Sequence, residues 1–128
     1  MSEMSNYLEN ALINVTLRNT AFTAVSQPYV ALFTSDPTDA GSGTEVSGGS
    51  YARAAVTFGA PSNGVSTNSA DVTFATATAS WGTVGWIGIY DASTAGNLLF
   101  HTPLDVAKTI DSGDIFKISS GNLSVTLA

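Results

Sequence analysis

The sequence predicts an all-β fold, an antiparallel β-sandwich or jelly roll of about eight strands preceded by one N-terminal α-helix. Strand-type segments recur between turn signals about every 8–14 residues along most of the chain. The chain contains 16 serines and 16 threonines, residue types that suit turns and strands respectively. The helical segment precedes the strands and does not alternate with them, which argues against a parallel sheet.

Composition narrows the organisation and the partners. The 128 residues are expected to form a single domain over 1–128. Charged residues make up 11% of the chain, against a usual share of about 25%, and the net charge is −6. Because charge is depleted at the centres of interfaces, part of the surface is expected to be hidden in an assembly. The 4 basic residues are scattered, so neither nucleic acid nor an anionic membrane is an expected partner.

Two further absences concern covalent chemistry and membranes. No cysteine is present, which excludes disulfides and thiolate chemistry. No apolar run is long enough to predict a membrane-spanning helix.

The N-terminal region, 1–19, is predicted to contain a helix from Tyr7 to Arg18, with Asn6 as its cap and Asn19 as its stop. The spacing of its apolar residues defines two stripes roughly 160° apart around the helix. The first stripe contains Leu8, Ala11, Leu12 and Val15, and the second contains Ile13 and Leu17. Either the domain covers both stripes, or one of them meets another subunit.

The strand signals follow in order along the chain. In Pro28–Thr34, the side chains that would point to each of the two faces of a strand are apolar, which predicts a strand covered on both faces. The Gly-rich segment 35–50 is predicted to be a long exposed loop. The remaining predicted strands are Tyr51–Gly59, Val72–Ala79, Trp81–Tyr90, Leu98–His101, Val106–Ile110, Asp114–Ile118 and Asn122–Leu127. Pro103 is expected to end the strand that begins at Leu98.

Two local signals within this series are specific. Asn63-Gly64 predicts a tight hairpin turn because both residues tolerate a positive φ. Gly82, Gly85 and Gly88 predict bulges or the close approach of neighbouring groups within their strand.

The residues that could carry chemistry point away from an enzyme. His101 is the only histidine and lies in a strand-like context, so we expect a hydrogen-bonded imidazole rather than a catalytic triad. Asp36, Asp39 and Glu45 cluster in the flexible loop, where a glycosidase pair would be poorly held. A Ca²⁺ site would suit the same trio better, but a solvated acidic loop is the simpler expectation. No catalytic residue, cofactor or metal is therefore predicted.

Aromatic residues offer one more candidate site. Trp86 and Tyr90 should share one strand face, with Trp81 on the other. They could form a platform for stacking a sugar, but a role in the core or between subunits is the more usual use of large aromatics.

Five stretches of the chain are distinctive when taken together: L-R-N-T-A-F-T, Y-V-A-L-F-T-S-D-P, E-V-S-G-G-S-Y-A-R, I-G-I-Y-D-A-S-T-A-G-N-L-L-F-H and G-N-L-S-V-T-L. They resemble small virion proteins of tailed phages, which carry tail-fibre labels and in some phages are similar to capsid cement proteins. The resemblance spans nearly the whole chain, from about Tyr7 to Leu127. The resemblance implies an all-β virion component that works as a homo-oligomer, often a trimer. The matching stretches contain no catalytic or metal-ligand motif to carry over.

The sequence therefore favours a capsid cement protein on the capsid exterior, bound to the major capsid protein and to copies of itself. The alternative is a tail-fibre or baseplate appendage with a role in adsorption or glycan binding. A depolymerase is the least favoured hypothesis. The residues expected to make subunit or shell contacts are Leu8, Leu12, Ile13, Leu17, Asp36, Asp39 and Glu45.

Overall fold

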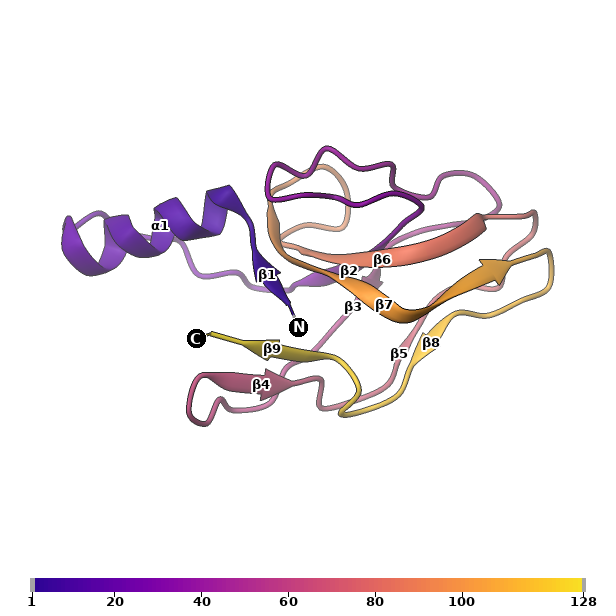
Figure 1. The fold of residues 1–128 in the computed structure, drawn as a ribbon. Helices are drawn as coiled ribbons and strands as arrows, with labels where there is room; N and C mark the ends of the chain where they lie inside the picture. The colour runs from indigo at the N-terminus through magenta and orange to yellow at the C-terminus, as the bar shows by residue number, and fades with distance from the viewer. Residues whose placement is uncertain (1, 128) are drawn as a thin grey trace.

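A computed structural model describes residues 2–127 and is built around a five-stranded antiparallel sheet. In spatial order, its strands are β1 (Glu3–Met4), β7 (Leu98–Ile110), β6 (Gly82–Tyr90), β2 (Tyr29–Phe33) and β3 (Ala54–Ala55). Two short antiparallel pairs lie beside it: β4 (Val65–Thr67) with β9 (Ser124–Thr126), and β5 (Val72–Thr73) with β8 (Lys117–Ile118). The helix α1 (Asn6–Leu17) projects from one end (Figure 1). The predicted all-β sandwich with one N-terminal helix is confirmed.

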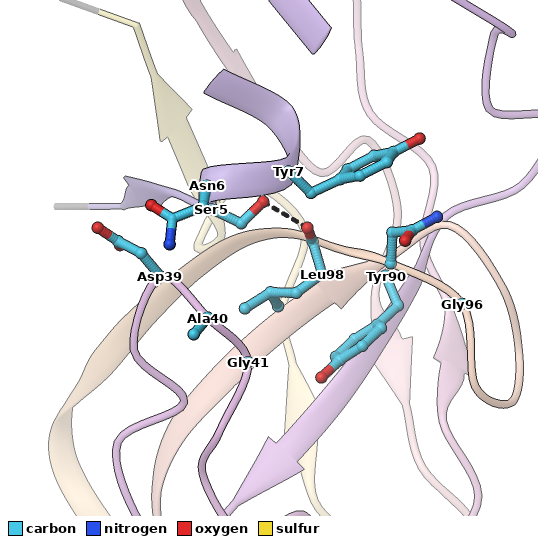
Figure 2. A pocket seen from close by; sticks show the side chains of 10 residues that line it. Ser5, Asn6, Tyr7, Asp39, Ala40, Gly41, Tyr90, Gly96 and Leu98 are labelled. Atoms are coloured by element: carbon cyan, nitrogen blue, oxygen red, sulfur yellow. Dashed lines mark hydrogen bonds between the residues drawn. The ribbon is translucent and has the colours of Figure 1, made fainter. Parts of the chain in front are cut away.

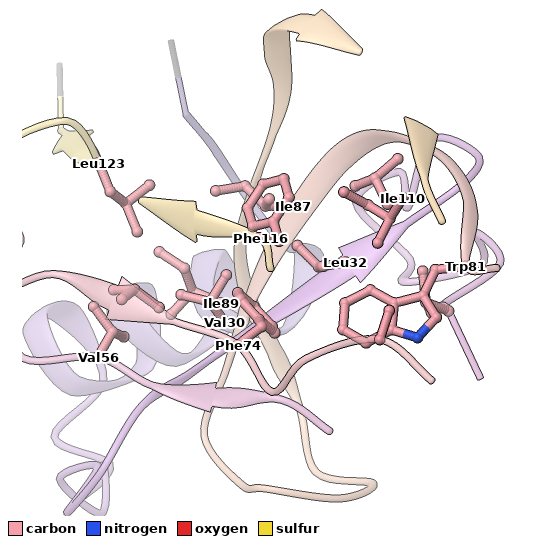
Figure 3. Packing of buried hydrophobic residues seen from close by; sticks show 14 of the residues in the cluster. Val30, Leu32, Val56, Phe74, Trp81, Ile87, Ile89, Ile110, Phe116 and Leu123 are labelled. Carbon is pink, nitrogen blue, oxygen red and sulfur yellow. The ribbon is translucent and has the colours of Figure 1, made fainter. Parts of the chain in front are cut away.

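The main core lies between the large sheet and the two short pairs. Val30 and Leu32 of β2 and Ile87 and Ile89 of β6 point to the same side of the sheet and are at most 4% exposed. They pack with residues of the second layer and its connections, including Phe74, Phe116 and Leu123 (Figure 3). Burying a side chain of this size contributes about 1.5–3 kcal/mol, so this layer is the main source of stability.

The opposite face of the large sheet carries a second, smaller apolar cluster. It consists of Ala31, Phe33, Tyr90 and Leu98, with Trp86 packed against it at partial exposure. The rings of Phe33 and Tyr90 stack with centroids 6.3 Å apart. The strand β2 is therefore covered on both faces, as its doubly apolar pattern predicts.

The 35–50 segment is more ordered than the predicted exposed loop, and that expectation is wrong at two residues. Val46 is 6% exposed and belongs to the main core, and Pro37 is fully buried. The Val46 N–H donates to the Leu32 carbonyl at 2.9 Å, so this part of the loop continues the hydrogen bonding of β2. Backbone N–H and C=O groups that are buried need hydrogen-bond partners. The part of the loop that covers apolar side chains therefore bonds to the sheet, and these bonds hold it there.

The expectation that Pro103 ends a strand is also wrong. Strand β7 runs through Pro103 and merges two predicted strands into one of 13 residues. Among residues 2–127, strand β1 pairs with β7 at Phe100 and His101, and β6 is the only strand that pairs with β7 from Pro103 onward. Proline is tolerated on such a sheet edge because its missing N–H breaks no ladder hydrogen bond.

Other predicted strands are shorter than expected, and isolated backbone hydrogen bonds continue beyond their ends. Only Ala54–Ala55 of Tyr51–Gly59 and Val72–Thr73 of Val72–Ala79 form strands. The buried side chain of Asn68 donates to the carbonyls of Ala70 and Ser119 and accepts from the Leu123 N–H at 2.9 Å. This single amide joins irregular segments that a regular sheet would otherwise connect.

The turn signal is confirmed, and the glycine signal is confirmed at Gly85 and Gly88 but not at Gly82, where a Cβ would make only an ordinary contact. Asn63 and Gly64 have φ values of 52° and 76°, and the flanking residues form a bridge. The register of β6 against β7 shifts between Val84 and Trp86, so that Gly85 stands opposite an irregular stretch of β7, residues 104–107, which contains the extra residues. A Cβ on Gly88 would lie 2.8 Å from Leu98 Cδ1 and 3.1 Å from Phe33 Cε1, so only glycine lets the outer cluster close over β6.

Candidate functional site

Hydrogen bonds fix the N-terminal end of α1, which we call its root, to the sandwich. Ser5, and not the predicted Asn6, is the N-cap, and its Oγ accepts from the Leu8 N–H at 3.2 Å. The Ser5 N–H donates to the Leu99 carbonyl at 2.9 Å, and the Asn6 N–H donates to the Asp39 carbonyl at 3.0 Å. Ser5 caps because its backbone is extended as it leaves β1.

The rest of α1 stands away from the strands (Figure 1). Leu8 is its one buried residue, and Leu12 is half-buried against the core. Ile13 is 52% and Leu17 80% exposed, so the domain leaves the second apolar stripe uncovered. The helix ends at Leu17 with Arg18 as its C-cap, and Asn19 directly after the cap has a φ of 52°, which confirms the predicted stop. The four predicted helix contacts therefore divide into two that anchor α1 and two that face solvent.

A pocket of about 250 Å³ lies between the root of α1, the 39–41 stretch of the loop and the end of β6 (Figure 2). Its lining includes Tyr7 and Asn6 from the helix, Asp39 from the loop, and Tyr90 and Leu98 from the sheet. The pocket is the point at which the projecting helix, the loop and the outer sheet face meet.

A buried arginine holds the loop against the sheet. Arg53 donates through Nε and Nη2 to the two carboxylate oxygens of Glu45, each at 2.9 Å. Its Nη1 donates to the carbonyls of Ala92 at 3.0 Å and Ala95 at 2.8 Å, in the turn after β6. The guanidinium carbon lies 3.8 Å from the centroid of the Tyr90 ring. A planar fork with two carboxylate contacts and an aromatic face is a geometry that lysine could not reproduce.

Tyr51 completes this cluster. Its hydroxyl donates to Glu45 Oε2 at 2.7 Å and accepts from the Leu32 N–H at 3.0 Å. Burial raises the pKa of Tyr51 well above the usual value for tyrosine, and the neighbouring Glu45 carboxylate raises it further. Burial also raises the pKa of Tyr90. The sequence pattern does not predict this cluster, although Glu45, Tyr51 and Arg53 all lie within the single stretch E-V-S-G-G-S-Y-A-R.

The three acidic loop residues do not form one site. Asp36 accepts the Thr38 N–H at 2.9 Å and stabilises a local turn. Glu45 pairs with Arg53, and Asp39 contacts His101. A shared Ca²⁺ site for this trio is therefore not formed, because each carboxylate has a different partner.

The aromatic residues divide between the two faces as predicted. Trp81 is 4% exposed in the main core and meets the Tyr51 ring edge-on, with centroids 5.4 Å apart. Tyr90 is covered by Phe33 and Arg53, which leaves Trp86 as the more accessible ring of the outer face. An open platform made from Trp86 and Tyr90 is not present.

His101 lies within β7 and is 4% exposed. Its Nε2 is 2.8 Å from Asp39 Oδ1 and 3.7 Å from Glu3 Oε2. The expected hydrogen-bonded imidazole is confirmed, with Asp39 as its partner. Glu3 also lies near this nitrogen, and no feature of the sequence pattern predicts that approach.

The fold is a β-sandwich with a projecting helix whose second apolar stripe is exposed. Residues 3–126 match the family model described as podophage GP4 fiber I protein gp80, and the chain belongs to this family. The resemblance to phage virion proteins is thereby confirmed, at the level of a fibre-type virion family. No curated protein matches the chain. Within residues 2–127, no helix is long and apolar enough to cross a membrane.

Proposed function

We propose that this protein is a structural component of a phage tail fibre, attached to the virion through contacts that include copies of itself. The observation that carries the proposal is the family match over residues 3–126, which is to a fibre protein. This favours the tail-appendage hypothesis over the capsid cement role, which rests on composition and on a more general resemblance.

The architecture supports a building role. The sandwich is closed by two apolar clusters, and the Arg53 cluster fixes its longest loop. A rigid module of this kind presents a surface without changing shape when it binds.

The projecting helix is the proposed point of contact between copies. It is 12 residues long and carries few charges, so little of its stability is intrinsic. Ile13 and Leu17 are exposed on one side, and the same stripes on neighbouring copies could pack together around a symmetry axis. Exposed apolar patches on an otherwise polar surface are typical of such interfaces.

Location and copy number in the virion test the proposal. Heads and tails separated from purified particles are analysed by quantitative mass spectrometry against the major capsid protein. A fibre component is expected in the tail fraction, in a small number of copies that is a multiple of the fibre symmetry. Recovery with the heads, at a simple ratio to the capsid protein, would establish the cement role instead.

A further inference from the structure

We propose that Glu3, Asp39 and His101 form a binding site for a first-row transition-metal dication, for which Zn²⁺ is the best match. The site would fasten the root of the projecting helix to the sandwich. The inference does not depend on where in the virion the protein lies.

The sheet register creates the first half of the site. Strands β1 and β7 pair so that Glu3 lies directly opposite His101. Directly opposed residues of an antiparallel pair place their side chains on the same face. The carboxylate and the imidazole therefore meet because of backbone pairing, and not through a chance contact of flexible side chains.

The loop supplies the second half. The Asp39 carbonyl accepts the Asn6 N–H at 3.0 Å, which holds this residue beside the end of β1. Its carboxylate then reaches His101 Nε2 at 2.8 Å. Three separate parts of the chain thus converge on one point, and their ligand atoms all lie within 4.8 Å of one another.

The spacing suits a tetrahedral metal ion. Bonds of about 2.0–2.2 Å from zinc to nitrogen and oxygen correspond to ligand atoms about 3.4 Å apart. The observed separations from Nε2, 2.8 Å to Asp39 and 3.7 Å to Glu3, lie on either side of this value. The ligand atoms of Glu3 and Asp39 lie within 4.8 Å of each other, so these two exposed side chains would rotate to bring all three ligands into range.

The mixture of rigid and adjustable groups supports the same conclusion. The His101 side chain is 4% exposed and is held within the sheet, whereas those of Glu3 and Asp39 are 66% and 47% exposed. The imidazole would therefore set the position of the ion and the carboxylates would adjust to it. Two carboxylates lie near a single ring nitrogen of His101. A proton on this nitrogen can form a hydrogen bond only with Asp39, because the distance of 3.7 Å to Glu3 is too long for a hydrogen bond.

The types of ligand atom, one imidazole nitrogen and two carboxylate oxygens, indicate which metal ions the site would bind. Imidazole nitrogen suits zinc, copper, iron and nickel, whereas Ca²⁺ and Mg²⁺ prefer oxygen ligands alone. Three protein ligands leave one tetrahedral position for water or for a group from a partner.

Binding would have a structural consequence. Strand β1 is only two residues long and leads directly through Ser5 into α1. Short terminal strands separate readily from a sheet unless they are fastened. An ion shared by β1, β7 and the loop would hold the helix in a fixed direction, and a ligand that binds only the folded state also raises stability.

The test uses the full chain without a polyhistidine tag, freed of metal by dialysis against a chelator. Zn²⁺ is titrated by calorimetry, and the imidazole nitrogen signals are followed by NMR. Because His101 is the only histidine, these signals need no assignment. We expect one Zn²⁺ per chain, a shift of the His101 nitrogen signals, a rise in the thermal midpoint with Zn²⁺ concentration, and no heat with Ca²⁺.

Variants identify the ligands. Asp39→Asn and Glu3→Gln remove one carboxylate charge each with little change in shape, and each should weaken Zn²⁺ binding at least about tenfold. Glu9→Gln, at an exposed carboxylate of α1, removes the same charge outside the site and should leave binding unchanged. The proposal is overturned if the protein takes up no Zn²⁺, if Ca²⁺ binds in its place, or if both ligand variants bind Zn²⁺ as tightly as the parent.

Discussion

At the scale of single residues, Arg53 does more than any other charged side chain to hold the fold together. It joins Glu45 in the long loop, the turn after β6 and the ring of Tyr90. The other Arg or Lys ion pair among residues 2–127, Lys117 with Asp71, lies on the surface, with both side chains about half exposed. Because burial weakens screening by water, the two pairs should differ strongly in their contribution to stability.

We expect Arg53→Met to lower the free energy of unfolding by about 3 kcal/mol, because it leaves Glu45 partly buried without its cation. Chemical denaturation with urea measures the change. Lys117→Met is the matched control, since it makes a similar substitution at the exposed pair and should have a much smaller effect. Equal losses in the two variants would show that the buried pair contributes no more to stability than the exposed pair does.

The raised pKa of Tyr51 predicts that the protein loses stability at alkaline pH. Its folded pKa is raised above its unfolded value of about 10, so the unfolded state loses its proton first as the pH rises. Stability is therefore fully present below pH 10 and falls above it. Unfolding midpoints measured from pH 8 to pH 11 should show this decline.

Absorbance of tyrosinate provides the corresponding readout. The fold contains four tyrosines, and ionisation of Tyr51 should accompany unfolding rather than precede it. Tyr51→Phe should flatten the pH dependence, although it also removes two hydrogen bonds and lowers stability at neutral pH. A pH dependence that is unchanged in this variant would assign the alkaline effect to other groups.

At the scale of secondary-structure elements, α1 is the least supported part of the molecule. Only Leu8 is buried, and the second half of the helix touches solvent on its apolar stripe. The loop 35–50 shows the opposite relation, because a segment without regular structure is held by buried residues at Pro37 and Val46. In this fold, therefore, the regular segment α1 is largely exposed, whereas the irregular loop 35–50 is held by buried residues.

We expect Leu17→Asp to raise the concentration at which oligomers dissociate by at least about tenfold, because it places a charge in a proposed apolar contact. Light scattering coupled to gel filtration measures this change. Thr16→Asp is the control: it adds the same charge in the same helical turn, outside the stripe defined by Ile13 and Leu17. A parent protein that is monomeric, or an oligomer unaffected by Leu17→Asp, would contradict a helix-mediated contact.

At the scale of the whole molecule, the sheet joins residues that are far apart in the chain. Glu3 pairs with His101, and Val65 pairs with Thr126. Residues near the two ends also meet, since the Thr126 N–H donates to Ser2 Oγ at 3.3 Å. Such non-local pairing requires large loops to close before contacts can form.

This topology predicts folding on the order of milliseconds to seconds, which is the range of β-sandwich domains. Stopped-flow refolding can be followed by tryptophan fluorescence, because Trp81 becomes buried in the main core. Refolding in microseconds would mean that local structure, such as α1, dominates the transition state.

The sequence alone determined the features that depend on neighbouring residues. Alternation assigned Trp86 and Tyr90 to the same face, because every second side chain of a strand points in the same direction. Asn63-Gly64 specified its turn because few other residues adopt a positive φ at low cost. The helix and its stop followed from periodicity and from Asn19 in the same way.

Only the tertiary structure decided which distant groups meet. Pro103 continues a strand because it lies on a sheet edge, and a sequence pattern does not specify which strands become edges. Glu45 was grouped with Asp36 by proximity in the chain, but it pairs with Arg53. His101 meets Glu3 through strand register and meets Asp39 through the packing of a loop. Local sequence sets the conformational preference of each segment, whereas register and layer packing are set by the burial of the whole core, and these place the proposed metal site.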